Sequence, residues 1–290
     1  MHLRLIDQIS IAGDGVNEDR AALSGAYAWV IDGATDVLDE RLTLAATDAD
    51  WIAGTLDATL RAYAARPACA FADLPGHITA SLSDAFAAET RRQPRSRHEH
   101  PSASGLIAKY EAGVLSYVSI GDCSMIVADK SYDEVRRFGV GNDEAGDRKL
   151  DPIVRAHLEG NARDAADAAP HAPLLKRMRT TLQSIREHMN HEHGYGVFSI
   201  TPTPDIFIRA GFVSVEPGTR ILLATDGFMR LVDVFACYDP ERLVGAVAER
   251  CLSNLVSELR ALECATPTTG ITPRIKPSDD ASALLIDVIS

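Results

Sequence analysis

Carboxylate residues recur through this chain at the ends of short apolar runs, where their chemistry would be the binding of metal ions. Short apolar runs of this kind are typical of buried strands. A carboxylate at a strand end is rigidly placed and still reaches solvent. Several such groups at one edge of stacked sheets would form a pocket of oxygen ligands, which hard divalent cations prefer. In chain order these residues are Glu18, Asp19, Asp32, Asp122, Asp226, Asp279 and Asp280.

The elements that must position these residues follow from the spacing of apolar side chains. Alternating or continuous apolar positions predict strands, and apolar residues on one face predict helices. Ala12–Arg20 is expected to be a polar turn, and Glu111-Ala112-Gly113 a hairpin turn. The predicted strands are 2–11, 25–31, 103–110, 113–120, 123–128, 195–200, 204–215, 220–225 and 281–289, and the predicted helices are 40–65, 77–92, 149–159, 170–189 and 240–263.

This order of elements predicts an α+β fold. Consecutive strands joined by hairpins imply antiparallel sheets, and helices grouped in pairs would cover the outer faces. We therefore expect a four-layer αββα sandwich, with two stacked antiparallel sheets flanked by helices. Residues 1–290 are interpreted as a single domain that carries an insertion at about 139–195, and no internal repeat is present.

Composition narrows the class of protein. The chain is 46% hydrophobic and 24% charged, as in ordinary soluble globular proteins. Its net charge of -12 argues against broad nucleic-acid binding, which needs a basic surface. The sequence has neither a stretch long enough to span a bilayer nor a secretory signal. The five cysteines lack CxxC pairing, which predicts reduced, mostly buried thiols and a cytoplasmic location.

Taken together, the acidic motifs resemble those of the metal-dependent type 2C (PPM) protein serine/threonine phosphatases, in a bacterial single-domain form. The similarity covers nearly the whole chain, with five motifs in the same order. In this family the place of residues 139–195 carries a flap beside the site. The matching motifs are Asn17-Glu18-Asp19, Val30-Ile31-Asp32-Gly33, Ser104-Gly105 with Ile120-Gly121-Asp122-Cys123, Leu223-Ala224-Thr225-Asp226-Gly227-Phe228, and Asp279-Asp280-Ala281-Ser282.

The resemblance implies a site for two Mn²⁺ or Mg²⁺ ions. Asp32 would bridge the two ions, and the Gly33 carbonyl would bind one of them. Asp226 and Asp279 would complete the shell of the first ion. Asp32, Asp226 and Asp279 are therefore the expected catalytic residues. Two such ions activate a shared water that attacks phosphorus directly, so no covalent intermediate is needed.

Three further acidic residues are assigned by the same resemblance. Glu18 and Asp19 would lie at the second ion, partly through water. Asp122 would help to hold a third, weaker ion beside Asp226, as in bacterial members of the family. Carboxylates this close repel one another, so metal binding is expected to stabilise the fold.

Two positions depart from the family pattern. The family usually has an arginine four residues before the motif's Glu, where it binds the substrate phosphate, and here that position is Asp14. Asp36 stands where the family often has a glycine after the Asp-Gly pair. The nearest substitute for the arginine is Arg20, and an arginine from the insertion is the alternative.

The histidines and one cysteine offer other interpretations. His98 and His100 form one cluster, and His188, His191 and His193 form a second; each is either a zinc site or a set of solvated loop residues. His191 or His193 is also a candidate for contact with the phosphate. Cys123 is interpreted as a buried structural residue rather than a reactive thiol.

Three functions remain open from the sequence. The leading hypothesis is a metal-dependent phosphatase acting on phosphoserine or phosphothreonine in proteins. The alternatives are a pseudophosphatase that uses the fold for regulation and an enzyme acting on a small phosphorylated metabolite. The expected partner is thus a phosphoprotein or a small phosphorylated substrate, with no nucleic acid and no membrane, and the oligomeric state is not determined by the sequence.

Overall fold

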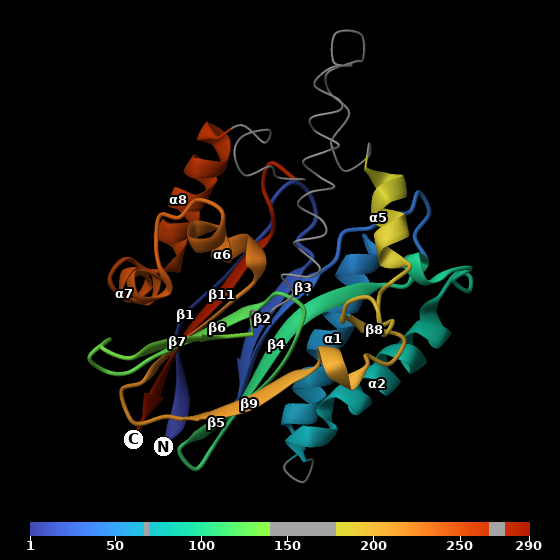
Figure 1. Cartoon of the computed structure of the whole chain (residues 1–290). Coiled ribbons are helices and arrows are strands. Elements are labelled where there is room, and N and C mark those ends of the chain that lie inside the picture. The colour runs from blue at the N-terminus through green and yellow to red at the C-terminus, as the bar shows by residue number, and fades with distance from the viewer. Residues whose placement is uncertain (67–69, 140–177, 267–275) are drawn as a thin grey trace.

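Two antiparallel sheets stack face to face, and helices cover both outer faces (Figure 1). The computed structural model describes residues 1–66, 70–139, 178–266 and 276–290. The predicted αββα sandwich is confirmed. No described helix is both long and apolar enough to cross a membrane.

The first sheet has the strand order β1-β11-β10-β6-β7. All of its pairings are antiparallel, although β1 and β11 come from opposite ends of the chain. Its strands are β1 (His2–Ile11), β6 (Ser124–Ala128), β7 (Val135–Phe138), β10 (Arg220–Ala224) and β11 (Ala281–Ile289).

The second sheet has the order β2-β3-β4-β5-β9, with the short strand β8 paired to β4. Its β4–β5 hairpin turns at Ala112 (φ 49°) and Gly113 (φ 85°), which confirms the predicted turn and suits a two-residue type I′ loop. Its strands are β2 (Asp19–Ser24), β3 (Tyr27–Gly33), β4 (Ser102–Glu111), β5 (Val114–Ile120), β8 (Phe198–Ser199) and β9 (Arg209–Ser214).

Alternation along β3 shows how the layers pack. Trp29 and Ile31 face the helices on the second sheet, whereas Ala28 and Val30 face the first sheet. Strand side chains point alternately to opposite faces, so one strand contributes to two cores. Helices α1 (Asp48–Ala64) and α2 (Leu74–Glu89) cover the second sheet; α6 (Asp226–Asp233), α7 (Pro240–Arg250) and α8 (Leu252–Ala265) cover the first.

Several short elements complete the described chain. Helix α5 (Arg179–Arg186) belongs to the insertion and lies beside η2 (Arg97–Glu99). Two further 3₁₀ turns are η1 (Phe71–Asp73) and η4 (Asp205–Phe207). The predicted helix 149–159 lies outside the described residues, as does the first part of the predicted helix 170–189.

The structure corrects some predicted elements. The turn Ala12–Arg20 ends early because Asp19 already begins β2, a strand that was not predicted, and neither β7 nor α6 was predicted. Helix 40–65 begins only at Asp48, since Asp48 accepts hydrogen bonds from the Leu42 and Thr43 amides and so holds the preceding loop. The predicted helix 240–263 is two helices, because Cys251 has a φ of 64°.

Candidate metal centre

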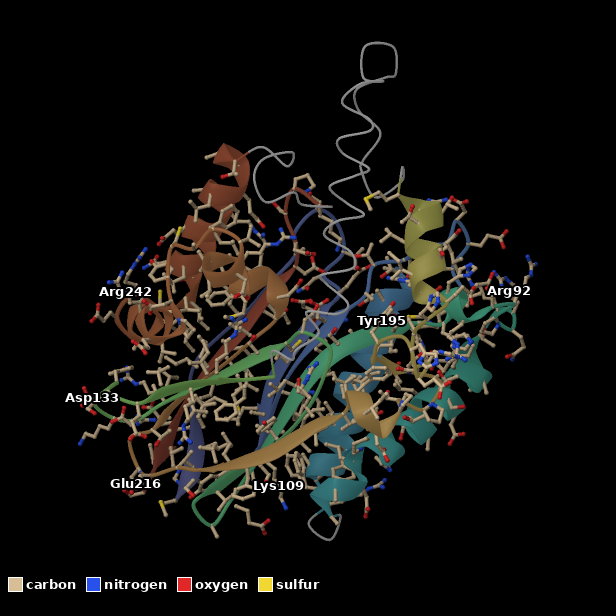
Figure 2. All side chains as sticks on the ribbon, in the orientation of Figure 1. Arg92, Lys109, Asp133, Tyr195, Glu216 and Arg242 are labelled. Atoms are coloured by element: carbon tan, nitrogen blue, oxygen red, sulfur yellow. The ribbon has the colours of Figure 1, made fainter. Side chains whose placement is uncertain are left out.

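The predicted acidic residues meet at one edge of the sandwich. Antiparallel pairing brings the start of one strand beside the end of its neighbour. Asp19 at the start of β2 accordingly lies opposite Asp32 near the end of β3. Asp226 follows β10 as the first residue of α6, and Asp279 lies just before β11. Figure 2 shows oxygen-bearing side chains gathered beyond these strand ends.

The carboxyl groups of Asp19, Asp32 and Asp226 each have a raised pKa. Burial raises the pKa of Asp19, and the neighbouring carboxylates, including Asp226 and Asp279, raise it further. Burial together with Asp226, Asp19 and Asp122 has the same effect on the pKa of Asp32. Burial, Asp122 and Asp279 raise the pKa of Asp226 to about 7. The cluster thus carries more negative charge than its surroundings compensate.

Asp226 acts strongly on Asp32. After burial, the charge of Asp226 is the largest cause that raises the pKa of Asp32. The cysteine that follows Asp122 is affected by the same charges. Burial and the nearby Asp32 raise the pKa of the Cys123 thiol well above its ordinary value. Cys123 is buried, as predicted, whereas Cys237, Cys251 and Cys264 are exposed, so the prediction of mostly buried thiols is wrong.

Asp279 is in a different electrostatic environment. Its Oδ1 accepts from Lys276 Nζ at 2.9 Å, and its Oδ2 accepts from Arg230 Nη2 at 2.7 Å. Burial alone would raise the pKa of Asp279, but Lys276 and Arg230 outweigh burial and hold that pKa below its ordinary value. One carboxylate of the cluster is therefore already paired with protein cations.

Arg230 is fixed by a second set of ion pairs. Its Nη1 donates to Glu263 Oε1 at 2.7 Å, and the Glu263 side chain is only 1% exposed. Arg260 bonds the other Glu263 oxygen at 2.6 Å and the main-chain oxygen of Asp279 at 2.7 Å. Helices α6 and α8 thus hold the position of Asp279. These partners were not predicted, although Arg230 follows Asp226 by one helical turn, which is a usable signal.

Thr225 connects the last motifs to the first. Its hydroxyl donates to Asp19 Oδ2 at 2.7 Å, and its oxygen accepts from the Ser282 amide at 3.0 Å. Gly227 is required by the same close approach, since a Cβ there would lie 1.8 Å from the Asp280 carbonyl oxygen. The motif around Asp226 is thereby packed against both neighbouring segments.

Glu18 and Asp280 organise the segment before β2. The Asp280 carboxylate accepts from the amides of Gly13 at 2.8 Å and Glu18 at 2.6 Å. The Glu18 side chain accepts from the Thr35 hydroxyl at 3.0 Å, and burial raises the pKa of Glu18. The Gly33 amide donates to the Glu18 carbonyl at 3.1 Å. The Gly33 carbonyl, which is the predicted metal ligand, takes no part in this bond.

The donor set fits hard divalent cations, although its carboxylates are paired with other groups. In the described part of the chain, no three His, Cys, Asp or Glu side chains form a group that would hold a metal ion as they stand. The ligands are all oxygen. Burial together with repulsion between the carboxylates raises the pKa of Asp19, Asp32 and Asp226, and a divalent cation would relieve this repulsion.

Two residues near the family's arginine position have structural contacts. Asp14 is exposed, and its Oδ2 accepts from the Ser278 amide at 3.2 Å. The Arg20 guanidinium donates to the carbonyls of Asn17 and Asp19 at 3.0 and 2.7 Å and to Asp50 Oδ1 at 2.5 Å. These bonds link β2 to α1, and the role of Arg20 toward a phosphate stays a prediction.

The described end of the insertion lies on the loop that follows Asp32-Gly33. Arg186 Nη2 donates to the Thr35 carbonyl at 2.6 Å, and Gln183 donates to the Val37 carbonyl at 2.9 Å. Burial lowers the pKa of Arg186, while Tyr195, Asp36 and Glu18 act in the opposite direction. Arg186 makes no ion pair with any described carboxylate. It was not singled out from the sequence, where only its place in the insertion favoured it.

Asp36 and the histidines have local partners. Asp36 accepts from the Asp48 amide at 2.9 Å and so helps to begin α1. His191 and His193 are exposed in the turn after α5, with their rings 5.7 Å apart. The other cluster is divided, since the ring of His98 contacts Glu187 whereas His100 is half-buried. No zinc-binding group is found among the described histidines, and contact of His191 or His193 with a phosphate stays a prediction.

Comparison with solved structures identifies the architecture. No model of a known protein family matches the chain, and no curated protein matches it. The serine/threonine phosphatase PstP/Ppp of Mycobacterium tuberculosis superposes with a TM-score of 0.55 at 13% identity, covering 100% of both chains. The catalytic domain of PstP in complex with 2 manganese ions gives 0.57 at 15% identity, covering 100% of this chain and 99% of the other.

A third match has a different biological setting. PppA of Pseudomonas aeruginosa, described as a key regulatory component of T6SS, superposes with a TM-score of 0.51 at 13% identity, covering 99% of this chain and 98% of the other. Superposition over nearly the whole chain shows that the fold is shared. At identities of 13–15%, it does not show that the activity is shared. The chain has the PPM-type fold of the bacterial serine/threonine phosphatases.

Proposed function

We propose that this chain is a metal-dependent hydrolase of phosphate monoesters, acting on phosphoserine or phosphothreonine in proteins. The observation that carries the proposal is the convergence of Asp19, Asp32, Asp122 and Asp226 at one edge of the sandwich, where burial and neighbouring carboxylates raise the pKa of Asp19, Asp32 and Asp226. The manganese complex of PstP, which has the same fold, supports a two-ion site here. We therefore propose that the ions bound here are Mn²⁺ or Mg²⁺.

The metal-holding residues are the ones expected from the motifs. Asp32, Asp226, Asp279 and the Gly33 carbonyl would bind one ion or bridge both, with Glu18, Asp19 and Asp122 around them. When bound, the ions would supply an activated water and neutralise charge on the phosphoryl group.

Other residues of the protein orient the carboxylates that would bind the metal ions. Thr225 orients Asp19, and Arg230 orients Asp279 from inside the protein. The raised pKa values of Asp32 and Asp226 favour their protonated forms, and a protonated carboxyl group must release its proton before it can act as a ligand. Loading the site is therefore expected to release protons, which a weakly buffered titration would detect.

Arg186 is the candidate for phosphate binding in place of the family's arginine. It lies on the loop after the Asp32-Gly33 pair and is influenced by Glu18 and Asp36, so its guanidinium is near the acidic centre. A guanidinium can bind a phosphate through two parallel hydrogen bonds. Arg20, by contrast, already gives its donors to two carbonyls and Asp50.

One observation favours a second function, a regulatory pseudophosphatase. Both oxygens of Asp279 are bound by protein cations. Lys276 and Arg230 thus supply positive charge at Asp279, where a metal ion would otherwise supply it. In such a protein the fold would bind a phosphorylated partner without turnover. A small phosphorylated metabolite as substrate is the remaining alternative, because Asp14 removes the usual phosphate contact.

One assay set separates these functions. Turnover of p-nitrophenyl phosphate with Mn²⁺, compared with panels of phosphopeptides and phosphorylated metabolites, is expected to be highest for the phosphopeptides. Asp226→Asn should reduce kcat by at least about a hundredfold. Asp233→Asn, at the other end of α6 and paired with Arg137 at the surface, is the matched control and should retain activity. Equal activity of wild type and Asp226→Asn would contradict the proposal.

A further inference from the structure

The two cations on Asp279 differ in how firmly they are held. Arg230 is 10% exposed and is bonded at once to Glu263 and Asp279, so its position is fixed from two sides. Lys276 is 26% exposed, and Asp279 is its one ion-pair partner among the described residues. A lysine ammonium on a flexible stem is also easier to displace than a doubly bonded guanidinium. Asp279 thus has one cation that is fixed from two sides, Arg230, and one cation without a second ion pair among the described residues, Lys276.

Lys276 lies among the expected metal ligands. Besides its 2.9 Å contact with Asp279 Oδ1, the Lys276 ammonium is attracted by Glu18 and Asp32, which belong to the segments before β2 and at the end of β3. Lys276 therefore supplies positive charge where the carboxylates of three separate segments meet. A divalent cation on Asp279 Oδ1 and an ammonium on the same oxygen would repel each other strongly at this separation.

We propose that Lys276 is a tethered competitor of the divalent cation at Asp279: its ammonium takes the place of a metal ion and must leave the carboxylate before the ion binds. This inference rests on the proposed metal site. Because the competitor is part of the chain, its local concentration is fixed, and the metal affinity of the protein is set below that of the carboxylates alone. The protein would load only when free Mn²⁺ is high enough to displace its own lysine.

Calorimetric titration with Mn²⁺ alone tests the proposal without any substrate. Lys276→Met removes the ammonium while keeping a long apolar side chain, and should tighten Mn²⁺ binding by about tenfold or more. Lys276→Arg keeps a competing charge that is harder to displace, so its Mn²⁺ affinity should equal that of wild type or be weaker. Lys130→Met, which removes an exposed lysine outside the site, is the matched control and should not change the affinity. An unchanged or weaker affinity in Lys276→Met overturns the proposal.

A second measurement uses the wild-type protein and so does not depend on how a variant folds. Acetylation of lysine amines with an N-hydroxysuccinimide ester is followed by peptide mass spectrometry, with and without saturating Mn²⁺. Labelling of Lys276 relative to Lys130 should rise when Mn²⁺ is added, because the displaced ammonium no longer pairs with Asp279. A constant or falling ratio contradicts displacement.

The same titration separates this proposal from the proposed function. If wild type binds Mn²⁺, Asp226→Asn does not, and Lys276→Met equals wild type, then the metal site stands and the competitor is overturned. If neither wild type nor Lys276→Met binds Mn²⁺, both proposals fail. If Lys276→Met binds Mn²⁺ well while wild type binds weakly, both are supported.

Discussion

The Thr225 hydroxyl donates a hydrogen bond to Asp19 Oδ2 at 2.7 Å, and the two residues belong to opposite sheets. Thr225 follows β10 of the first sheet, whereas Asp19 begins β2 of the second. Both side chains are buried, and the same threonine oxygen accepts from the Ser282 amide. This single hydroxyl therefore links the segments that follow β10 and begin β2 at the edge where the carboxylates meet.

Replacing Thr225 with valine should separate the metal ligands as well as weaken the fold. Valine keeps the shape but leaves the Asp19 carboxylate and the Ser282 amide without this partner, at a cost of about 1–3 kcal/mol. We expect a lower free energy of unfolding in urea and weaker Mn²⁺ binding by calorimetry. Thr225→Ser, which keeps the hydroxyl, should behave like wild type. Equal properties of the valine and serine variants would argue against this role.

The metal-free protein should lose stability as pH rises from about 4 to about 7. Burial and neighbouring carboxylates raise the pKa of Asp226 to about 7, and those of Asp19 and Asp32 are also raised. Between the unfolded and folded pKa values the native state binds more protons than the unfolded state, so its advantage is complete at low pH and disappears as pH increases.

Thermal melting of protein stripped of metal beforehand, at pH 5 and pH 8, measures this loss. Asp226→Asn cannot titrate at that position and should show a smaller decrease of Tm over the same interval. Addition of Mn²⁺ at pH 8 should restore the Tm of wild type, because ligand binding stabilises the native state. Parallel melting curves for wild type and Asp226→Asn would contradict the assignment of the shifted group.

The acidic residues themselves were predictable from local sequence. Asp32 and Asp226 each follow an apolar run whose strand character is set by its own residues. Antiparallel pairing then places Asp19 opposite Asp32 in one sheet, and the start of β11 beside the end of β10 in the other. Strand β2 was missed for a related reason. Its residues include Arg20, Ala21 and Ala22, which have little intrinsic strand preference, and its strand character comes from pairing with β3.

The partners of the carboxylates were not predictable in this way. Arg230 and Asp279 are 49 residues apart, and Arg230 and Glu263 are 33 apart, so only the packing of α6 and α8 on the first sheet joins them. Lys276 had a local signal, three residues before Asp279, but it lies in the segment 267–277, whose three prolines predicted only a loop and no particular contact. Pairs set by tertiary packing leave no periodic pattern in the sequence.

Adding an arginine at the family's usual position should improve activity on phosphopeptides. Asp14 is exposed and its carboxylate accepts from the Ser278 amide, next to Asp279, so its charge lies close to the acidic edge. Asp14→Arg replaces that negative charge with a phosphate ligand, and kcat/KM should rise by up to about tenfold. Asp14→Asn, which only removes the charge, should give a smaller gain. A folded Asp14→Arg with lower kcat/KM would favour the metabolite or regulatory function.

Replacing each of the two candidate arginines with alanine should show which of them binds the phosphate and which stabilises the fold. Arg186→Ala is expected to raise KM for a phosphopeptide by about tenfold or more with little change in Tm, since its described bond is to one carbonyl. Arg20→Ala should lower Tm with less effect on KM, because Arg20 joins β2 to Asp50 of α1.

Arg179→Ala, on the same helix as Arg186 and paired with Asp39 at the surface, controls for disturbance of α5. Arg186→Lys should recover part of the loss, because it restores the charge without the paired donors. If KM instead rises in Arg20→Ala and stays unchanged in Arg186→Ala, the phosphate is bound by the β2 arginine and the insertion serves another purpose.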